Sequence, residues 1–325
     1  MKKLLQFLML SLGCYGLINA VKKTPEDKEA DREFFDAVYE KVLRKRNWTV
    51  DDYITKQHEV MRYEALKYFE KNGDLSRKDL QDLDTHMKNA FKIAESNTQC
   101  SIESNKLNPE QAQKLKSFFE SHHIYGPLVI KRKSCERWNG LAGSEIISTV
   151  GNSKQTIKRR VSLGDLFWVY NFNQENPNVY GTLLHEASHL KNLHGIERQF
   201  LRNKMPKSTT YGVKKYQHYK ETQADQYYAS KNLEDARALE KHYKQASRDH
   251  WESLNHPAGE KRYQVIKYIK GLLKAQHRWP QIHYEKYGQP AIECMYDRAD
   301  ERAKSLANYG KSFFKKCTNK IGLFE

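Results

Sequence analysis

The sequence predicts an α+β fold that is mostly helical, with a small β-sheet and accessory helices at both ends. Charge-rich segments of helix-forming residues occupy both ends of the chain, beginning with residues 24–72. Short runs rich in β-branched and aromatic residues lie in the middle, at Pro127–Ile130, Glu145–Val150 and Leu166–Tyr170, and are the expected strands. A chain of 325 residues is long enough to bury a substantial core.

The N-terminus is typical of a secretory signal peptide. The chain begins Met-Lys-Lys, residues 4–18 are mostly apolar, and Ile18-Asn19-Ala20 fits a cleavage site. The apolar run is about 14 residues, shorter than the ~20 that cross a bilayer. We therefore expect cleavage after Ala20 and a periplasmic or secreted protein. As alternatives, an uncleaved signal or a lipid on Cys14, within a weak lipoprotein-like motif, would hold the chain at a membrane.

Cysteine usage agrees with export to an oxidising compartment. Four cysteines follow the signal, Cys100, Cys135, Cys294 and Cys317, and none forms a Cys-x-x-Cys pair. They suffice for two disulfides, for which three connectivities exist. We favour Cys100 with Cys135 and Cys294 with Cys317, because these pairings close the shorter loops.

Residues 21–122 are expected to form a helical region ahead of the core. Apolar residues within 24–72 are spaced for one helix face. Ser76–Asp79 is a capping-box-like start of a second helix, and Asn108-Pro109 starts a third.

A helix over about residues 178–194 is predicted after the strands. Asn176 supplies an N-cap, Pro177 suits the first helical position, and Gly195 stands where a helix would end. The apolar residues between them recur at spacings of three and four, as in a half-buried helix: Val179, Leu183, Leu184, Ala187, Leu190 and Leu193.

This helix carries the motif His-Glu-Ala-Ser-His at residues 185–189. Positions i and i+4 lie on one helix face, so His185 and His189 can direct two ring nitrogens at one metal ion. Glu186 then reaches a water on that metal, as in a zinc peptidase. Burying these polar groups without a partner would cost several kcal/mol, which favours a metal. The alternative is a metal-free cluster whose members satisfy one another.

Glu221 is the expected third ligand. Catalytic zinc takes three protein ligands and keeps a position for water, and two histidines with one glutamate form an established set. The predicted helix over residues 214–233 contains neither Pro nor Gly and places Glu221 and Asp225 on one face. Asp225 can then accept the outer N–H of a ligand histidine. The alternative is an exposed acidic pair on a charged helix.

Together these motifs resemble the gluzincin family that includes HtpX and the CAAX prenyl proteases. The order is His-Glu-x-x-His, then Glu-x-x-Ala-Asp at Glu221–Asp225, then His256-Pro257 with Arg262 six residues after the histidine. The resemblance covers roughly residues 125–275. It implies a mostly helical, zincin-like metallopeptidase core whose small sheet holds substrate along its edge strand. It also implies a catalytic role for His256 and Arg262 in substrate or oxyanion handling; alternatively, His256-Pro257 only begins a helix.

The nearest counterpart of the family's edge strand is Trp138–Gly143, and the family's membrane-spanning helices have no counterpart. An exposed edge holds an extended peptide by main-chain hydrogen bonds. Further helices are expected at 232–251, 257–275 and 290–308. The predicted regions are a signal peptide at 1–20, an N-terminal helical region at 21–122, a zinc metallopeptidase core at 123–276 and a C-terminal helical extension at 277–325.

The chain is strongly basic, with a formal net charge of +16. The runs Lys131–Lys133 and Lys158–Arg160 would attract an anionic membrane surface weakly, or form solvated faces, which is the commoner role of such runs. No nucleic-acid-binding module is recognisable, so we expect no nucleic-acid partner.

The predicted function is hydrolysis of peptide bonds by an exported zinc endopeptidase with one zinc ion per chain. Zinc would acidify a water and polarise the scissile carbonyl, while Glu186 takes the water's proton and passes it to the leaving amine. The expected oxyanion donor is His256 or Arg262, with Tyr211, Tyr216 and His218 as alternatives. The substrate would be an unfolded or extended polypeptide, as in envelope protein quality control. The alternative is a zinc-binding chaperone or binding protein with little proteolytic activity.

Overall fold

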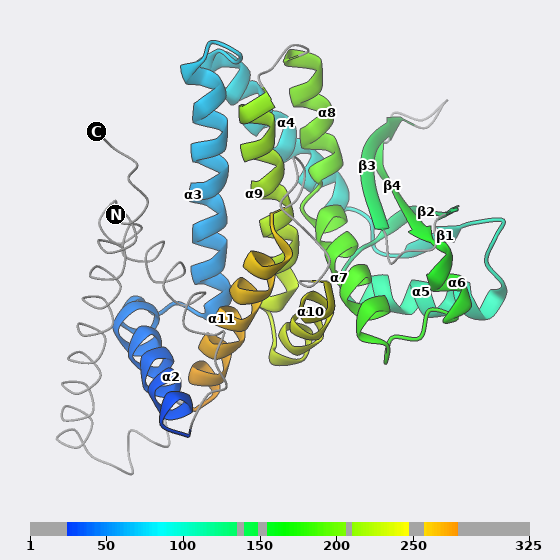
Figure 1. Ribbon diagram of the computed structural model, residues 1–325. Helices are drawn as coiled ribbons and strands as arrows, with labels where there is room; N and C mark the ends of the chain where they lie inside the picture. Colours follow the sequence, from blue (N-terminus) through cyan, green and yellow to red (C-terminus); the bar gives the residue numbers. More distant parts are fainter. Residues whose placement is uncertain (1–24, 135–139, 149–154, 206–209, 247–256, 279–325) are drawn as a thin grey trace. The chain divides into compact units, whose positions relative to one another are not determined.

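The computed structural model describes residues 25–134, 140–148, 155–205, 210–246 and 257–278. In this part the chain is a mixed α+β protein in which helices dominate and a small sheet has four strands (Figure 1). The predicted α+β class is therefore confirmed.

The chain divides into two compact units. Met1–Tyr53 and Tyr263–Glu325 form the first, here called the terminal unit, and Ile54–Arg262 form the second, called the central unit. Helices that the sequence analysis placed in a separate N-terminal region therefore belong to the same unit as most of the predicted core.

The described part of the terminal unit is helical. The Phe35 ring lies 5.6 Å from the Tyr268 ring, and Gly271 makes room for it, because a Cβ at Gly271 would lie 2.3 Å from Phe35. The helical segments are α2 (Pro25–Val38), a π-helix (Tyr39–Leu43), a 3-10 turn (Arg44–Arg46), the start of α3 (Val50–Lys71) and most of α11 (Gly259–Arg278).

The central unit contains the remaining helices of the described chain. As predicted, α4 begins with a capping box of Ser76 and Asp79, and α5 begins after Asn108 with Pro109 in its first turn. Asn108 also forms a capping box with Gln111, which was not predicted. Residues of α3, α4, α8 and α9 share a buried apolar cluster that includes Leu83. The helices are α4 (Arg77–Glu95), α5 (Pro109–Ser121), α6 (Asp165–Val169), α7 (Pro177–Lys191), α8 (His194–Lys204), α9 (Thr210–Ala229) and α10 (Leu233–Ala246).

The sheet has the strand order β1-β2-β4-β3, with β1 (Cys100–Glu103), β2 (Gly126–Lys133), β3 (Gly140–Ser148) and β4 (Gln155–Gly164). The β1, β2 and β4 strands are parallel, whereas β3 runs antiparallel to β4 and lies at the edge of the sheet (Figure 1). Ala142 of β3 stands opposite Val161 of β4. The edge strand packs beside α7 and α8.

Two of the three predicted strands are present, as β2 and β3. The strand predicted at Leu166–Tyr170 is wrong, because residues 165–169 form the short helix α6. This apolar run was too short for periodicity to distinguish a strand from a helix turn. The strands β1 and β4 were not predicted.

The favoured disulfide between Cys100 and Cys135 does not agree with the described strands. Cys100 is a buried free thiol whose pKa is raised by burial to about 11, and it pairs in the sheet with Gly126. From Gly126 the strand β2 runs to Lys133, roughly 23 Å away at ~3.3 Å per residue. A disulfide needs Cα atoms within ~7 Å, and the two residues from Lys133 to Cys135 cannot span the way back.

The predicted signal peptide with Cys14 lies outside the described residues, as do Cys294, Cys317 and the helix expected at 290–308. None of the described helices combines the length and the apolar character needed to cross a bilayer.

Candidate metal centre

Helix α7 carries the His-Glu-x-x-His motif and is largely buried. As predicted, Asn176 caps its N-terminus, where Oδ1 accepts a hydrogen bond from Asn178 N at 2.9 Å, and Pro177 is the first helical residue. Buried leucines along the helix hold it in the core, so the position of the motif is set by packing.

The predicted end of this helix at Gly195 is wrong. The helix ends at Lys191, after which Leu193 adopts a left-handed backbone with a φ of 53°. Gly195 lies inside α8, where a Cβ would be 2.4 Å from the backbone nitrogen of Ser144 on β3. The glycine therefore serves the close approach of α8 to the edge strand.

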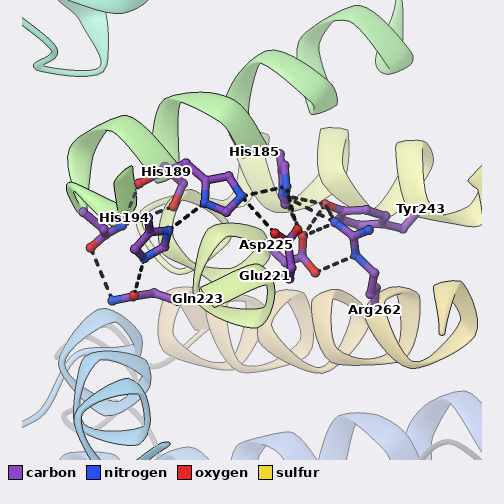
Figure 2. A network of polar contacts seen from close by, with 10 residues as sticks. His185, His189, His194, Glu221, Gln223, Asp225, Tyr243 and Arg262 are labelled. Atoms are coloured by element: carbon purple, nitrogen blue, oxygen red, sulfur yellow. Dashed lines mark hydrogen bonds and ion pairs between the residues drawn. The ribbon is translucent and has the colours of Figure 1, made fainter. Parts of the chain in front are cut away.

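Three side chains from two helices converge as candidate metal ligands (Figure 2). The Nε2 atoms of His185 and His189 lie 3.1 Å apart. Glu221 of α9 places Oε2 at 3.2 Å from His185 Nε2 and Oε1 at 3.5 Å from His189 Nε2. A tetrahedral zinc ion with bonds of ~2.0–2.1 Å would separate its ligand atoms by roughly 3.3 Å. These three side chains could therefore hold a metal ion.

The outer nitrogen of His185 is held by Asp225, the partner that the sequence predicted. His185 Nδ1 lies 2.9 Å from Asp225 Oδ1, and both groups are buried. A carboxylate only accepts, so Nδ1 carries the hydrogen and Nε2 presents its lone pair to the ligand cluster.

Asp225 is itself fixed by two further side chains (Figure 2). Arg262 donates from Nε to Oδ2 at 2.8 Å and from Nη2 to Oδ1 at 2.6 Å, and the Tyr243 hydroxyl also donates to Oδ1. Burial alone would raise the pKa of Asp225, but Arg262 and His185 hold it well below its usual range. The carboxylate that orients His185 therefore stays ionised.

His189 is oriented by a hydrogen-bond relay that sequence reasoning missed. His189 Nδ1 lies 2.6 Å from His194 Nδ1, and His194 Nε2 lies 2.7 Å from Gln223 Oε1. Gln223 Nε2 donates to Asn192 Oδ1 at 3.3 Å, and Asn192 Nδ2 donates to the backbone carbonyl of Ser188 at 2.9 Å.

The relay has a single direction, because the carbonyl at its end can only accept. Asn192 donates its amide N–H to the Ser188 carbonyl, so its oxygen accepts from the amide of Gln223. The oxygen of Gln223 therefore faces His194, and His194 carries its hydrogen on Nε2. Burial holds the pKa of His194 well below its usual value, so this ring is neutral and its Nδ1 accepts. His189 donates from Nδ1 and, like His185, presents the lone pair of Nε2.

The ligand cluster attracts positive charge. Burial opposes protonation of His185, but hydrogen bonds to Asp225 and Glu221 outweigh it and raise the pKa of His185 to about 10. A proton and a metal cation would therefore compete for the same lone pairs.

Glu186 lies beside the candidate ligands and is not one of them. It is 4% exposed and accepts the backbone N–H of Ala142 on β3. Burial raises the pKa of its carboxyl. Gly140 makes room for it, since a Cβ at Gly140 would lie 2.4 Å from Glu186 Oε1. A carboxyl with a raised pKa in this position is suited to proton transfer.

A pocket of about 460 Å³ opens beside these groups. Its lining includes His185, Glu186, His189 and Glu221 together with residues 140–145 of the edge strand. A molecule in the pocket would thus meet the ligand cluster and the backbone of β3 together.

Arg262 does not occupy the position expected of an oxyanion donor. Its guanidinium is bound to Asp225, it donates to the Tyr243 hydroxyl at 2.8 Å, and it does not line the pocket. It meets the candidate ligands through Asp225 and through His185, whose Nδ1 lies 3.4 Å from Arg262 Nη2. Among the alternatives, Tyr216 is buried and donates to Glu197 at 2.7 Å, while His256 and the Tyr211 side chain lie outside the described residues.

Comparisons of the chain with protein-family models, curated proteins and solved structures find no match. The resemblance to gluzincins therefore stays a prediction from the sequence motifs.

Proposed function

We propose that this protein is a zinc-dependent endopeptidase of the gluzincin type, with a zincin-like core. One observation carries the proposal. The Nε2 atoms of His185 and His189 lie 3.1 Å apart, and Glu221 places one oxygen 3.2 Å from the first and its other oxygen 3.5 Å from the second. The outer nitrogens of both histidines are engaged by Asp225 and His194. One bound zinc ion would satisfy all three converging groups at once, in place of the proton that His185 otherwise holds.

In this proposal His185, His189 and Glu221 hold one zinc ion. When bound, zinc supplies an acidified water and an electrophile for the scissile carbonyl. Glu186 accepts a proton on its carboxylate and later gives it to the leaving amine. The N–H of Ala142 and the space at Gly140 hold the Glu186 carboxylate beside the ligand cluster.

An extended polypeptide is the substrate that the edge strand favours. Successive residues of β3 point their backbone N–H and C=O groups alternately toward β4 and away from it. The N–H of Ala142 bonds to Glu186, so Ala142 and also Gly140, two residues earlier, point these groups away from β4. The helix α8 covers the strand at Ser144, and the pocket-lining residues 140–143 precede that point. Main-chain hydrogen bonds to residues 140–143 of β3 would hold an unfolded substrate segment, whatever most of the substrate's side chains are.

Export is part of the proposal and rests on the sequence of residues 1–20. A periplasmic or secreted peptidase that takes extended chains would suit protein quality control in the cell envelope.

The deciding experiment compares wild type with Glu186→Gln, using purified protein, metal analysis and cleavage of a casein-like unfolded substrate. We expect one zinc per chain in both forms and a loss of at least ~10²-fold in cleavage rate for the variant, because the amide keeps the size of the side chain but cannot accept the proton. Glu175→Gln is the matched control, since Glu175 is exposed and precedes the same helix.

Equal cleavage by Glu186→Gln and wild type, with contaminating proteases excluded, would refute the mechanism. Zinc binding by both forms without cleavage of any unfolded substrate would favour a zinc-binding chaperone instead.

A further inference from the structure

The pocket beside the ligand cluster carries an excess of positive charge. Its lining contains five lysines and arginines but three glutamates. Two of the basic residues come from β4 and have acidic partners at 3.7 Å: Lys158 with Glu103, and Arg160 with Glu145. The excess therefore lies elsewhere in the pocket.

Lys220 of α9 contributes a buried positive charge to this excess. It is 4% exposed and lines the pocket, and within the described part of the chain no carboxylate forms an ion pair with it. Its ammonium lies 5.0 Å from the centre of the Tyr216 ring. The nearby Glu197 is already bound by Arg62 at 2.6 Å, and Glu221 faces the two histidines. A buried ammonium without its own counter-ion is costly, and an anion in the pocket would offset that cost.

Arg198 of α8 adds a second positive charge to the same pocket. It is exposed and makes no ion pair with any residue that the structure describes. Lys220 and Arg198 line the same pocket, where their like charges repel each other. An anion bound between them would relieve this repulsion.

We propose that Lys220 and Arg198 form a subsite for a carboxylate of the substrate, so that the protein prefers acidic peptides. The inference rests on the proposed peptidase function, and it places the subsite next to the ligand cluster, since Lys220 precedes Glu221. A peptide offers carboxylates from two sources, the side chains of Asp and Glu and the C-terminal end.

The test measures binding rather than cleavage, using the full-length, zinc-loaded Glu186→Gln variant and fluorescence anisotropy. Labelled, amidated peptides of one extended sequence carry Glu or Gln at a single scanned position. We expect the Glu peptide to bind on the order of 10- to 100-fold more tightly at one position. Adding Arg198→Gln or Lys220→Met should reduce this preference to less than ~3-fold. Arg202→Gln is the control, because Arg202 is exposed on the same helix and does not line the pocket.

A second pair of peptides separates the two sources of carboxylate. These peptides have neutral side chains and end in a free carboxylate or an amide. A preference for the free end that is lost in Arg198→Gln and Lys220→Met assigns the subsite to the chain terminus.

Equal binding of all charged and neutral pairs would overturn the subsite. The subsite would also be overturned if the variants lost affinity equally for the charged and the neutral peptide of a pair. That result would indicate that the two cations bind the peptide backbone or the oxyanion. If Lys220→Met does not fold, Arg198→Gln carries the test, because Arg198 is exposed. If wild type cleaves Glu and Gln peptides equally, the subsite fails while the peptidase stands. Should it cleave neither, a preference abolished by the two variants would still establish the subsite.

Discussion

Glycine at position 140 sets the space in which the Glu186 carboxylate lies. A Cβ there would lie 2.4 Å from Glu186 Oε1 and 2.5 Å from its Cγ, so the side chain would have to leave its place. Gly143 of the same strand would meet nothing within 4 Å. A methyl group added at Gly140 would therefore displace Glu186, whereas one added at Gly143 would displace no side chain.

We therefore expect Gly140→Ala to lower peptide cleavage by on the order of 10²-fold while keeping zinc, because a small displacement of a proton-transfer group is costly in rate. Gly143→Ala should lower cleavage far less, because its added methyl group would not displace Glu186. Steady-state cleavage and metal content check both variants. A fully active Gly140→Ala protein would show that Glu186 does not need its present position.

Part of the candidate site was accessible to sequence reasoning because helix spacing puts His185 and His189 on one face of one helix, and Glu221 and Asp225 on one face of another. That the two faces meet was expected from the ligand set of catalytic zinc, and the three side chains do converge, with Asp225 beside His185. The partner of His189 was missed because it depends on a turn: the left-handed Leu193 brings His194 back toward His189. The available signal was a third histidine five residues after His189.

At the scale of elements, the contact between α8 and the edge strand β3 positions the pocket wall. Gly195 permits this contact, since a Cβ would lie 2.4 Å from Ser144 N and 2.9 Å from Ser144 O. These are backbone atoms, so neither can move away as a flexible side chain would.

Alanine normally stabilises a helix by about 0.5–1 kcal/mol relative to glycine. At Gly195 we expect the opposite sign, a loss of about 1–3 kcal/mol, because the added methyl forces α8 and β3 apart. The free energy of unfolding is measured by urea denaturation monitored by fluorescence, with Gly143→Ala as the control. A Gly195→Ala protein more stable than wild type would contradict the close contact.

The elements that sequence reasoning missed have physical causes. In β4 the buried positions alternate through Ile157, Arg159, Val161 and Leu163, and the buried arginine interrupts the apolar pattern of a strand. Lys158–Arg160 looked like a solvated basic run, yet strand alternation buries Arg159 while its two neighbours line the pocket. Helix α8 was hidden because Gly195 was taken as a helix end.

At the scale of the whole molecule, all described residues of the candidate site belong to the central unit. The candidate ligands lie on α7 and α9, and Arg262 ties the start of α11 to Asp225 of α9. A metal held by two helices would stabilise their packing in proportion to its affinity.

Removal of zinc by a chelator should therefore increase amide hydrogen exchange in α7 and α9. Free zinc at 1,000 times its Kd would contribute ~4 kcal/mol to the stability of the folded central unit. Helix α2 of the terminal unit is the internal reference and should keep its exchange rate. Mass spectrometry of peptides from both units gives the comparison, and unchanged exchange in α7 with and without chelator would argue against a structural link through the metal.

The relay behind His189 starts and finishes on the same helix. Its four hydrogen bonds pass through His194, Gln223 and Asn192 and close on the Ser188 carbonyl, one residue before His189 itself. The tautomer of His189 thus depends on the backbone of the last turn of α7. If that turn frays, the His189 ring is free to turn its other nitrogen toward the metal. The metal affinity of this chain would therefore depend on whether the C-terminal turn of α7 is folded. A metal can bind at His189 only when that turn is helical.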